Sequence, residues 1–256
     1  MTMKKVLIAG DSFAFGHGCS DRTHYYDTNT KSWVGDDSNF VDTKTWRYFP
    51  SQYCWGNLVQ KEYSNCTVIN LSIPGADNTY ILDQIVNNCN DVDLVLCSFT
   101  GHNRIRVQSE YSTEQEEDKF PGCWVLGQPT QNNKDYTKAQ EYFLKYLYSE
   151  KYFLSVALST VFAAYGICKL KNIPFYWAMP FLDDVDFLKD QKHIDFANKF
   201  NILADLQFAS LNDYKFCKDE NNEWIKIYRS VDGHVNDKGH EYYYQHIIKP
   251  VVSKHL

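Results

Sequence analysis

Four short apolar runs, each followed by a turn or a helical pattern, constrain the fold of this chain more than any other feature. Each run is typical of a buried strand. Between them, apolar residues recur at helical spacing, as in the series that begins at Ile81. Strands that alternate with helices predict an α/β fold with a mostly parallel sheet. The four runs lie near residues 4–9, 67–71, 93–98 and 174–179.

The length and composition fit one domain with a sizeable core. The chain has 256 residues, of which 44% are hydrophobic, and neither an internal repeat nor a linker divides it. We therefore expect a single domain over residues 1–256, with long insertions at about 20–53 and 104–137. Residues 105–137 are polar and predict irregular structure.

Charge, cysteine spacing and hydropathy exclude several classes of protein. A net charge of −6, with scattered Lys and Arg, argues against nucleic-acid binding. The eight cysteines show neither a C-x-x-C pair nor zinc spacing, which predicts free thiols, a reducing compartment and no metal. The N-terminal apolar run is too short for a signal peptide, and no run approaches the length of a membrane span. We expect a cytoplasmic protein without a membrane segment; its oligomeric state is left open.

The first apolar run ends at Gly10-Asp11-Ser12. Asp and Ser are ordinary helix caps, and for this tripeptide alone a capping role is the simpler interpretation. A serine at the end of a strand can also serve as a nucleophile, with helix N–H groups near the atom it attacks. Residues 10–16 lack the Gly-Lys-Ser/Thr of a phosphate loop and any dinucleotide fingerprint, so no nucleotide or other cofactor is predicted.

Three further turns complete a pattern with Ser12. Gly75 and Asn103 follow the second and third predicted strands, and Asp232 and His234 lie in the loop before the last predicted helix. In an open parallel sheet the carboxyl ends of the strands gather along one edge, where ligands bind. Acyl transfer needs a nucleophile, a base, a group that orients the base, and donors for the oxyanion. The ordered set supplies all four, and this favours the nucleophile interpretation of Ser12.

The set resembles the SGNH (GDSL-like) hydrolase superfamily over most of the chain. Gly10–Phe13 resembles the first block of that superfamily, 73–78 the second, 101–103 the third, and Asp232 with His234 the last. The resemblance implies a three-layer α/β/α sandwich around a flavodoxin-like, five-stranded, mostly parallel sheet. It also implies an ester-hydrolysing site, with Ser12 as nucleophile, His234 as base and Asp232 as its partner. The oxyanion hole would comprise the N–H groups of Ser12 and Gly75 and the side chain of Asn103.

The sequence departs from the usual blocks of the superfamily at two places. Arg104 follows Asn103 where the third block usually has Asp, and the last block is Asp-x-His instead of Asp-x-x-His. Two other histidines are rival bases. His17 is close to Ser12 in sequence, and His240 falls inside a predicted C-terminal helix over 237–256 that Pro250 interrupts. A base usually comes from a distant loop, which favours His234.

Three functions are compatible with these residues. The first is a serine esterase or deacetylase that hydrolyses a small ester, with a carbohydrate O-acetyl group as one candidate. Its partner would be a small-molecule or carbohydrate ester. The others are an acyltransferase on the same fold and a non-catalytic binding or structural protein. The carbohydrate hypothesis depends on the aromatic residues that follow the Ser12 turn, because such rings stack on sugars; they are Tyr25, Tyr26, Trp33, Phe40, Trp46, Tyr48, Phe49, Tyr53 and Trp55. The alternative is that most of these rings build a small core that anchors the insertion, and one or two exposed rings would be enough for the hypothesis.

Overall fold

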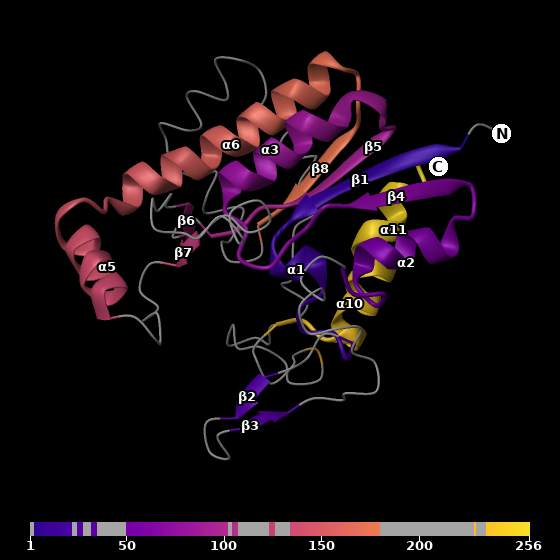
Figure 1. Cartoon of the computed structure of the whole chain (residues 1–256). Coiled ribbons are helices and arrows are strands. Elements are labelled where there is room, and N and C mark those ends of the chain that lie inside the picture. Colours follow the sequence, from indigo (N-terminus) through magenta and orange to yellow (C-terminus); the bar gives the residue numbers. More distant parts are fainter. Residues whose placement is uncertain are drawn as a thin grey trace.

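A four-stranded parallel sheet forms the centre of the molecule (Figure 1). The computed structural model describes residues 3–21, 25–27, 32–34, 50–101, 104–106, 123–125, 134–179, 228 and 234–256. The strands are β1 (Lys4–Gly10), β4 (Cys66–Asn70), β5 (Leu94–Ser98) and β8 (Phe175–Ala178). Their order is β4-β1-β5-β8, and each neighbouring pair is parallel. The predicted α/β fold and its four core strands are thereby confirmed.

The strand order is that of the first four strands of a flavodoxin-like sheet. β1 is central, β4 joins it on one side, and β5 and then β8 join on the other. The described residues contain no fifth strand of this sheet. The crossing point between β1 and β5 is where such sheets bind ligands.

Residues of the central strand alternate between the two faces of the sheet. Leu7 and Ala9 pack into one core, whereas Val6 and Ile8 pack into the other. Both cores are buried, which explains why the strand is apolar without alternating with polar residues. The helices lie in layers on either side of the sheet (Figure 1).

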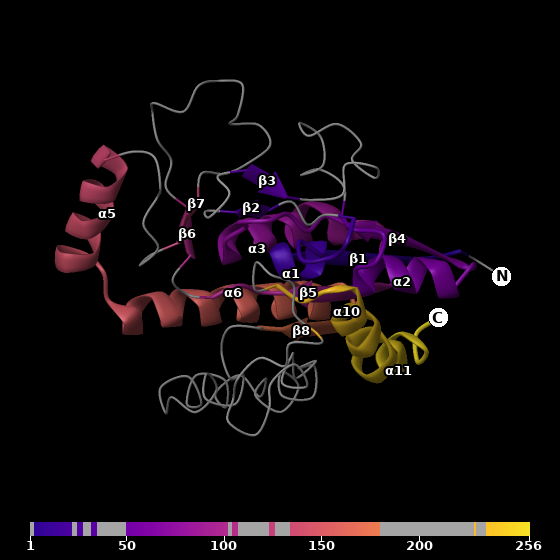
Figure 2. The ribbon, with the colours of Figure 1, turned by 90° about the horizontal axis from the view of Figure 1, so that it is seen from below.

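One face, above the sheet in Figure 1, is covered by α3 (Asn78–Asn88) and α6 (Glu150–Leu170). α5 (Lys134–Tyr146) precedes α6 and lies beyond the end of the sheet in both views (Figures 1 and 2). The stretch Tyr152–Leu170 is long and apolar enough to cross a membrane by length and composition. The expectation that no run approaches that length is therefore wrong. About 33% of the most apolar part of this stretch is buried inside the molecule. Its core residues include Leu158 and Val161.

The other face, below the sheet in Figure 1, is covered by α2 (Trp55–Glu62) and by the C-terminal helical segment. That segment comprises α10 (Asp237–Tyr243), the π-helical turn η6 (Tyr244–Ile248) and α11 (Lys249–Val252). Pro250 does not interrupt it, contrary to our prediction. Proline lacks an N–H and its ring crowds the carbonyl four residues earlier. Just before Pro250 the helix widens into a π-helical turn, in which the Lys249 N–H donates to the Tyr244 carbonyl, five residues earlier.

Each insertion contains a short antiparallel hairpin. β2 (Tyr25–Asp27) pairs with β3 (Ser32–Val34) in the first. β6 (Arg104–Arg106) pairs with β7 (Cys123–Val125) in the second, so the prediction of irregular structure throughout 105–137 is wrong. The hydrophobic pattern did not reveal either hairpin because each strand is only three residues long.

Candidate active site

The turn after β1 presents Ser12 at the carboxyl edge of the sheet. Asp11 has an extended backbone, and its side chain accepts a hydrogen bond of 3.0 Å from the Phe13 N–H, so it caps α1 (Ser12–Phe15). α1 folds back so closely that a Cβ on Gly10 would stand 2.6 Å from the Ala14 Cβ. The capping role that the tripeptide suggested thus belongs to Asp11, which leaves the hydroxyl of Ser12 for other contacts.

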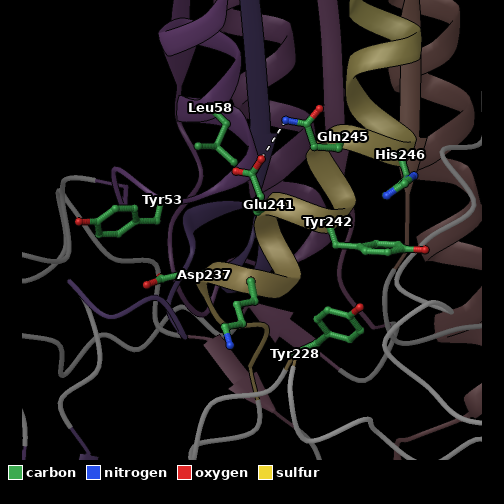
Figure 3. A pocket seen from close by; sticks show the side chains of 9 residues that line it. Tyr53, Leu58, Tyr228, Asp237, Glu241, Tyr242, Gln245 and His246 are labelled. Atoms are coloured by element: carbon green, nitrogen blue, oxygen red, sulfur yellow. Dashed lines mark hydrogen bonds between the residues drawn. The ribbon is translucent and has the colours of Figure 1, made fainter.

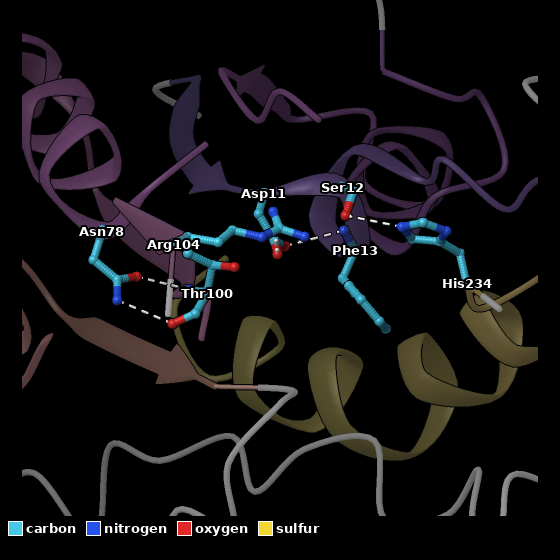
Figure 4. A network of polar contacts seen from close by, with 7 residues as sticks. All are labelled: Asp11, Ser12, Phe13, Asn78, Thr100, Arg104 and His234. Atoms are coloured by element: carbon cyan, nitrogen blue, oxygen red, sulfur yellow. Dashed lines mark hydrogen bonds and ion pairs between the residues drawn. The ribbon is translucent and has the colours of Figure 1, made fainter. Parts of the chain in front are cut away.

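His234 lies within hydrogen-bond distance of Ser12. The His234 Nε2 is 3.0 Å from the Ser12 Oγ, although the two residues are 222 positions apart. In Figure 4 the hydroxyl points at the imidazole. The His234 ring packs against Phe13, with centroids 5.4 Å apart. Asn236, whose side chain accepts from the Gly239 N–H, caps α10 just after this residue. The structure therefore brings together the two ends of the chain that the sequence analysis paired.

The two rival histidines occupy different positions. His17 packs its ring against that of His234, with centroids 4.7 Å apart, so it forms part of the same cluster. His240 is 1% exposed, and its Nδ1 accepts a long hydrogen bond of 3.4 Å from the Trp55 N–H. Burial lowers the pKa of His240 to about 3, against the opposing charge of Asp237. His240 is thus a neutral residue of the core.

The turn that carries Gly75 lies beside the end of β1. The Ile73 N–H donates to the Gly10 carbonyl over 3.1 Å, which holds the chain after β4 next to the Ser12 turn. Gly75 has φ +81°, and a Cβ there would meet no atom within 4 Å. The conformation therefore requires glycine, and its Cα faces open space. Within the described part of the chain, we find no acceptor for the N–H of Ser12 or of Gly75.

A pair of hydrogen bonds joins the second turn to the third. The Asn78 side chain donates to the Thr100 carbonyl over 3.0 Å and accepts from the Thr100 N–H over 2.7 Å. Both residues are buried. Our sequence analysis did not foresee this contact. An Asn in the first turn of a helix was visible in the sequence, but its partner across the sheet edge was not.

Arg104 forms an ion pair with Asp11 (Figure 4). Its Nη1 is 3.5 Å from the Asp11 Oδ2. The Asp11 side chain is 0% exposed and that of Arg104 is 13% exposed. Burial raises the pKa of the Asp11 carboxyl above its usual range, while the Arg104 charge and the Phe13 N–H act in the opposite direction. Arg104, which stands where the third block of the superfamily usually has Asp, thus contacts Asp11 of the first block.

Two predicted site residues, Asp232 and Asn103, lie outside the described residues. Their neighbours are described. The Arg104 N–H donates to the Gly101 carbonyl over 3.1 Å, so the chain on both sides of Asn103 is at the carboxyl edge. Asp232 precedes His234 by two residues. The roles of Asp232 and Asn103 stay predictions.

A separate hollow of about 470 Å³ opens beside α10 (Figure 3). Tyrosines and carboxylates line it, among them Tyr53, Tyr242, Asp237 and Glu241. It contains neither Ser12 nor His234. No group of His, Cys, Asp and Glu among the described residues is arranged to hold a metal ion.

Solved structures similar to this chain cover nearly its whole length. One is a putative lipolytic protein of the G-D-S-L family from Desulfitobacterium hafniense, with 13% identity, a TM-score of 0.48, and coverage of 94% of this chain and 96% of the other. A lipase/acylhydrolase from Enterococcus faecalis shares 13% identity with a TM-score of 0.47, covering 98% and 97%. An acetyl xylan esterase shares 12% identity with a TM-score of 0.47, covering 96% and 99%.

No protein-family model matches the chain, and no curated protein sequence matches it significantly. At such low identity, the chemistry of this chain has to be argued from its own residues.

Proposed function

We propose that this protein is a serine hydrolase that cleaves a small ester through an acyl-enzyme on Ser12. The observation that carries the proposal is the 3.0 Å contact between the Ser12 Oγ and the His234 Nε2 at the carboxyl edge of a parallel sheet. A hydroxyl becomes a nucleophile when a neighbouring base can take its proton. An imidazole at hydrogen-bond distance meets that geometric requirement.

The reaction follows from the roles of these residues. The Ser12 Oγ attacks the ester carbonyl while the His234 Nε2 takes the hydroxyl proton. The negative charge that develops on the carbonyl oxygen would be met by the N–H groups of Ser12 and Gly75 and by the side chain of Asn103. The imidazolium then gives its proton to the leaving alcohol. Water then attacks the acyl carbonyl while His234 takes one of its protons. The bond to the Ser12 Oγ breaks, the acid leaves, and His234 returns the proton to Ser12. Asp232 would orient the other imidazole nitrogen.

The alcohol part of the substrate is the finer part of the proposal. An O-acetylated carbohydrate is our candidate, because nine aromatic residues lie between Tyr25 and Trp55, after the Ser12 turn. Trp55 itself is 1% exposed and packs on Tyr243 in the core, so a sugar would have to contact the other rings. We expect this insertion and that of 104–137 to belong to one domain with the sheet. The candidate is tested by comparing rates on acetylated sugars and on a simple acetyl ester of equal leaving ability. If the rates on the two kinds of ester are equal, and neither changes when the exposed rings are replaced by Ala, the carbohydrate candidate is wrong.

The decisive experiment for the mechanism is active-site labelling. A fluorophosphonate probe should label the native chain, and Ser12→Ala should abolish the label. Ser253→Ala is the matched control, because that serine is exposed and its hydroxyl donates to the Pro250 carbonyl on α11, within the C-terminal helical segment. A folded native chain without label would indicate a binding protein, and label that survives Ser12→Ala would show the wrong nucleophile.

The chemistry of the second step needs one further measurement. With p-nitrophenyl acetate as donor, hydrolysis should proceed without an added alcohol. If the chain releases only one equivalent of p-nitrophenol, and continues to release it only when an alcohol acceptor is added, the chain is an acyltransferase instead.

A further inference from the structure

A cation from an insertion forms an ion pair with the nucleophile turn. Arg104 is the first residue of β6, in the hairpin with β7, and its guanidinium reaches the Asp11 carboxylate. We propose that Arg104 is a positioning residue for Ser12, acting through Asp11. The inference rests on the proposed hydrolase function and adds to it a residue outside the predicted triad and oxyanion hole.

The first step of the argument is the role of Asp11. Its Oδ1 accepts from the Phe13 N–H over 3.0 Å and thereby fixes the first turn of α1, which begins with Ser12. The orientation of the Ser12 hydroxyl toward His234 therefore depends on how firmly Asp11 holds that turn. A displacement of about 1 Å in a reacting group can cost about 10²-fold in rate.

The second step is the need of Asp11 for a partner. An ionised carboxylate without exposure is stable only when it is paired or hydrogen-bonded; otherwise it takes up a proton. The Asp11 Oδ1 is occupied by the Phe13 N–H, and the Oδ2 faces Arg104. Arg104 is itself only 13% exposed, so water screens the pair weakly.

Among the described residues, two charged side chains act on Asp11. Arg104 approaches from β6, and His234 lies on the side of Ser12. Of these two, only the guanidinium is charged at every working pH. The ionised form of the buried Asp11 carboxylate therefore depends on Arg104.

The kinetic test compares Arg104→Gln with Arg104→Lys. We expect Arg104→Gln to lower kcat by about 10²-fold with little change in KM. Arg104→Lys should recover part of the loss because it restores the charge. Lys4→Gln is the matched control, because it removes the cation of the ion pair at the opposite end of β1. An unchanged kcat in Arg104→Gln would overturn the proposal.

A second measurement does not depend on activity. The Asp11 carboxyl is followed by ¹³C NMR in protein labelled at aspartate carboxyls, assigned by Asp11→Asn. Removing Arg104 should raise the pKa at which this carbon titrates, whereas Lys4→Gln should not. An unchanged titration would contradict the proposal even if the chain proved not to be a hydrolase. Conversely, a shifted titration in an unreactive chain would refute only the proposed function.

A double variant covers the case in which Arg104→Gln folds poorly. Asn is as good a helix cap as Asp, and it needs no counter-charge. Asp11→Asn/Arg104→Gln should therefore be more active and more stable than Arg104→Gln alone. If the double variant is no better than the single one, Asp11 does not mediate the effect of Arg104 and the proposal is wrong.

Discussion

The two ends of β1 carry ion pairs that look alike and differ in environment. At the amino end, the Lys4 Nζ is 2.9 Å from the Asp93 Oδ1, with side chains 40% and 35% exposed. At the carboxyl end, Arg104 and Asp11 are 3.5 Å apart, with side chains 13% and 0% exposed. Exposed pairs contribute about 0–1 kcal/mol, whereas breaking a buried pair costs about 3–5 kcal/mol. The longer contact is therefore the more important one, because burial outweighs distance.

The other polar contacts at the two ends of β1 also differ in burial. The amino end is tied by surface contacts, including the Lys5 N–H to Asp93. At the carboxyl end, polar side chains are buried and constrained by one another. Variants that disturb the carboxyl end should thus lower activity, and those that break its packing or its ion pair should also lower stability. Variants at the amino end should change either quantity little.

The largest effect is expected for Ser12→Ala. Turnover of p-nitrophenyl acetate should fall by about 10⁴–10⁶-fold, since the nucleophile is removed. The melting temperature should change little, because Asp11 still caps α1. Initial rates and circular-dichroism melting measure the two quantities. Substantial residual turnover would mean that the carboxyl end of β1 does not hold the nucleophile.

Asn103→Ala comes next. If its amide donates to the oxyanion, kcat should fall by about 10²–10³-fold at nearly constant KM. Asn88→Ala is the control, because that amide bonds to the Gln84 carbonyl within α3, away from the catalytic edge. Steady-state kinetics decide the matter, and equal effects of the two variants would count against the predicted oxyanion hole.

Acid should destabilise the fold through His240. Its pKa is about 3 in the folded chain, against about 6.5 in the unfolded chain. The unfolded state therefore binds a proton first, so stability falls as the pH drops from about 6.5 toward 3. This single group contributes up to about 1.4 kcal/mol per pH unit. The free energy of unfolding is measured in urea at several pH values. Its dependence on pH should be weaker in His240→Gln and unchanged in His246→Gln, because His246 is exposed.

Gly10→Ala tests the close approach of α1 to the end of β1. The added Cβ would stand 2.6 Å from the Ala14 Cβ and 3.1 Å from Ser98 atoms. We expect a loss of about 1–3 kcal/mol by overpacking, together with reduced activity as Ser12 shifts. Gly166→Ala in α6 is the opposite case, because its Cβ would meet nothing within 4 Å. It should stabilise by about 0.5–1 kcal/mol in urea unfolding; a loss as large as that of Gly10→Ala would undermine the packing argument.

The smallest effect is expected for Lys4→Gln. The Lys4 amine and the Lys5 N–H hold the pKa of Asp93 below its usual range. This contribution is therefore present at neutral pH and is lost as the pH falls through the folded pKa of Asp93. Because both side chains are well exposed, the loss at pH 7 should stay below about 1 kcal/mol. Activity should be unchanged, and a catalytic defect would show that the two ends of β1 are not independent.

The central strands could be predicted from the sequence because parallel strands buried on both faces are continuously apolar. The approach of His234 to Ser12 was also predictable, since it depends on which strand ends share an edge. The course of the chain at Pro250 was not, because a helix can absorb a proline by widening one turn. The expectation that no run approaches the length of a membrane span was wrong for α6. A core helix and a membrane span can have similar compositions, so composition alone does not distinguish them.

The contacts that support the site could not be predicted. Arg104 was recognised only as a departure from a block, and nothing in its neighbours indicates that it reaches Asp11. The hydrogen bonds between Asn78 and Thr100 pose the same difficulty. Such contacts depend on side-chain directions at the ends of different elements, which hydrophobic periodicity does not encode.

The first insertion is closed at its base by Asp21. One Asp21 oxygen accepts from the Ser51 hydroxyl over 2.5 Å and the other from the Gln52 N–H over 3.0 Å. Ser20, next to Asp21, donates to Asp237. These hydrogen bonds hold the two ends of the insertion together at the edge of the sheet. The entropy of closing a loop changes slowly with its length, so a change in the length of the segment between Asp21 and Ser51 adds little to the entropic cost of closing it. Evolution or an engineer could thus replace this segment while leaving β1 and Ser12 in place.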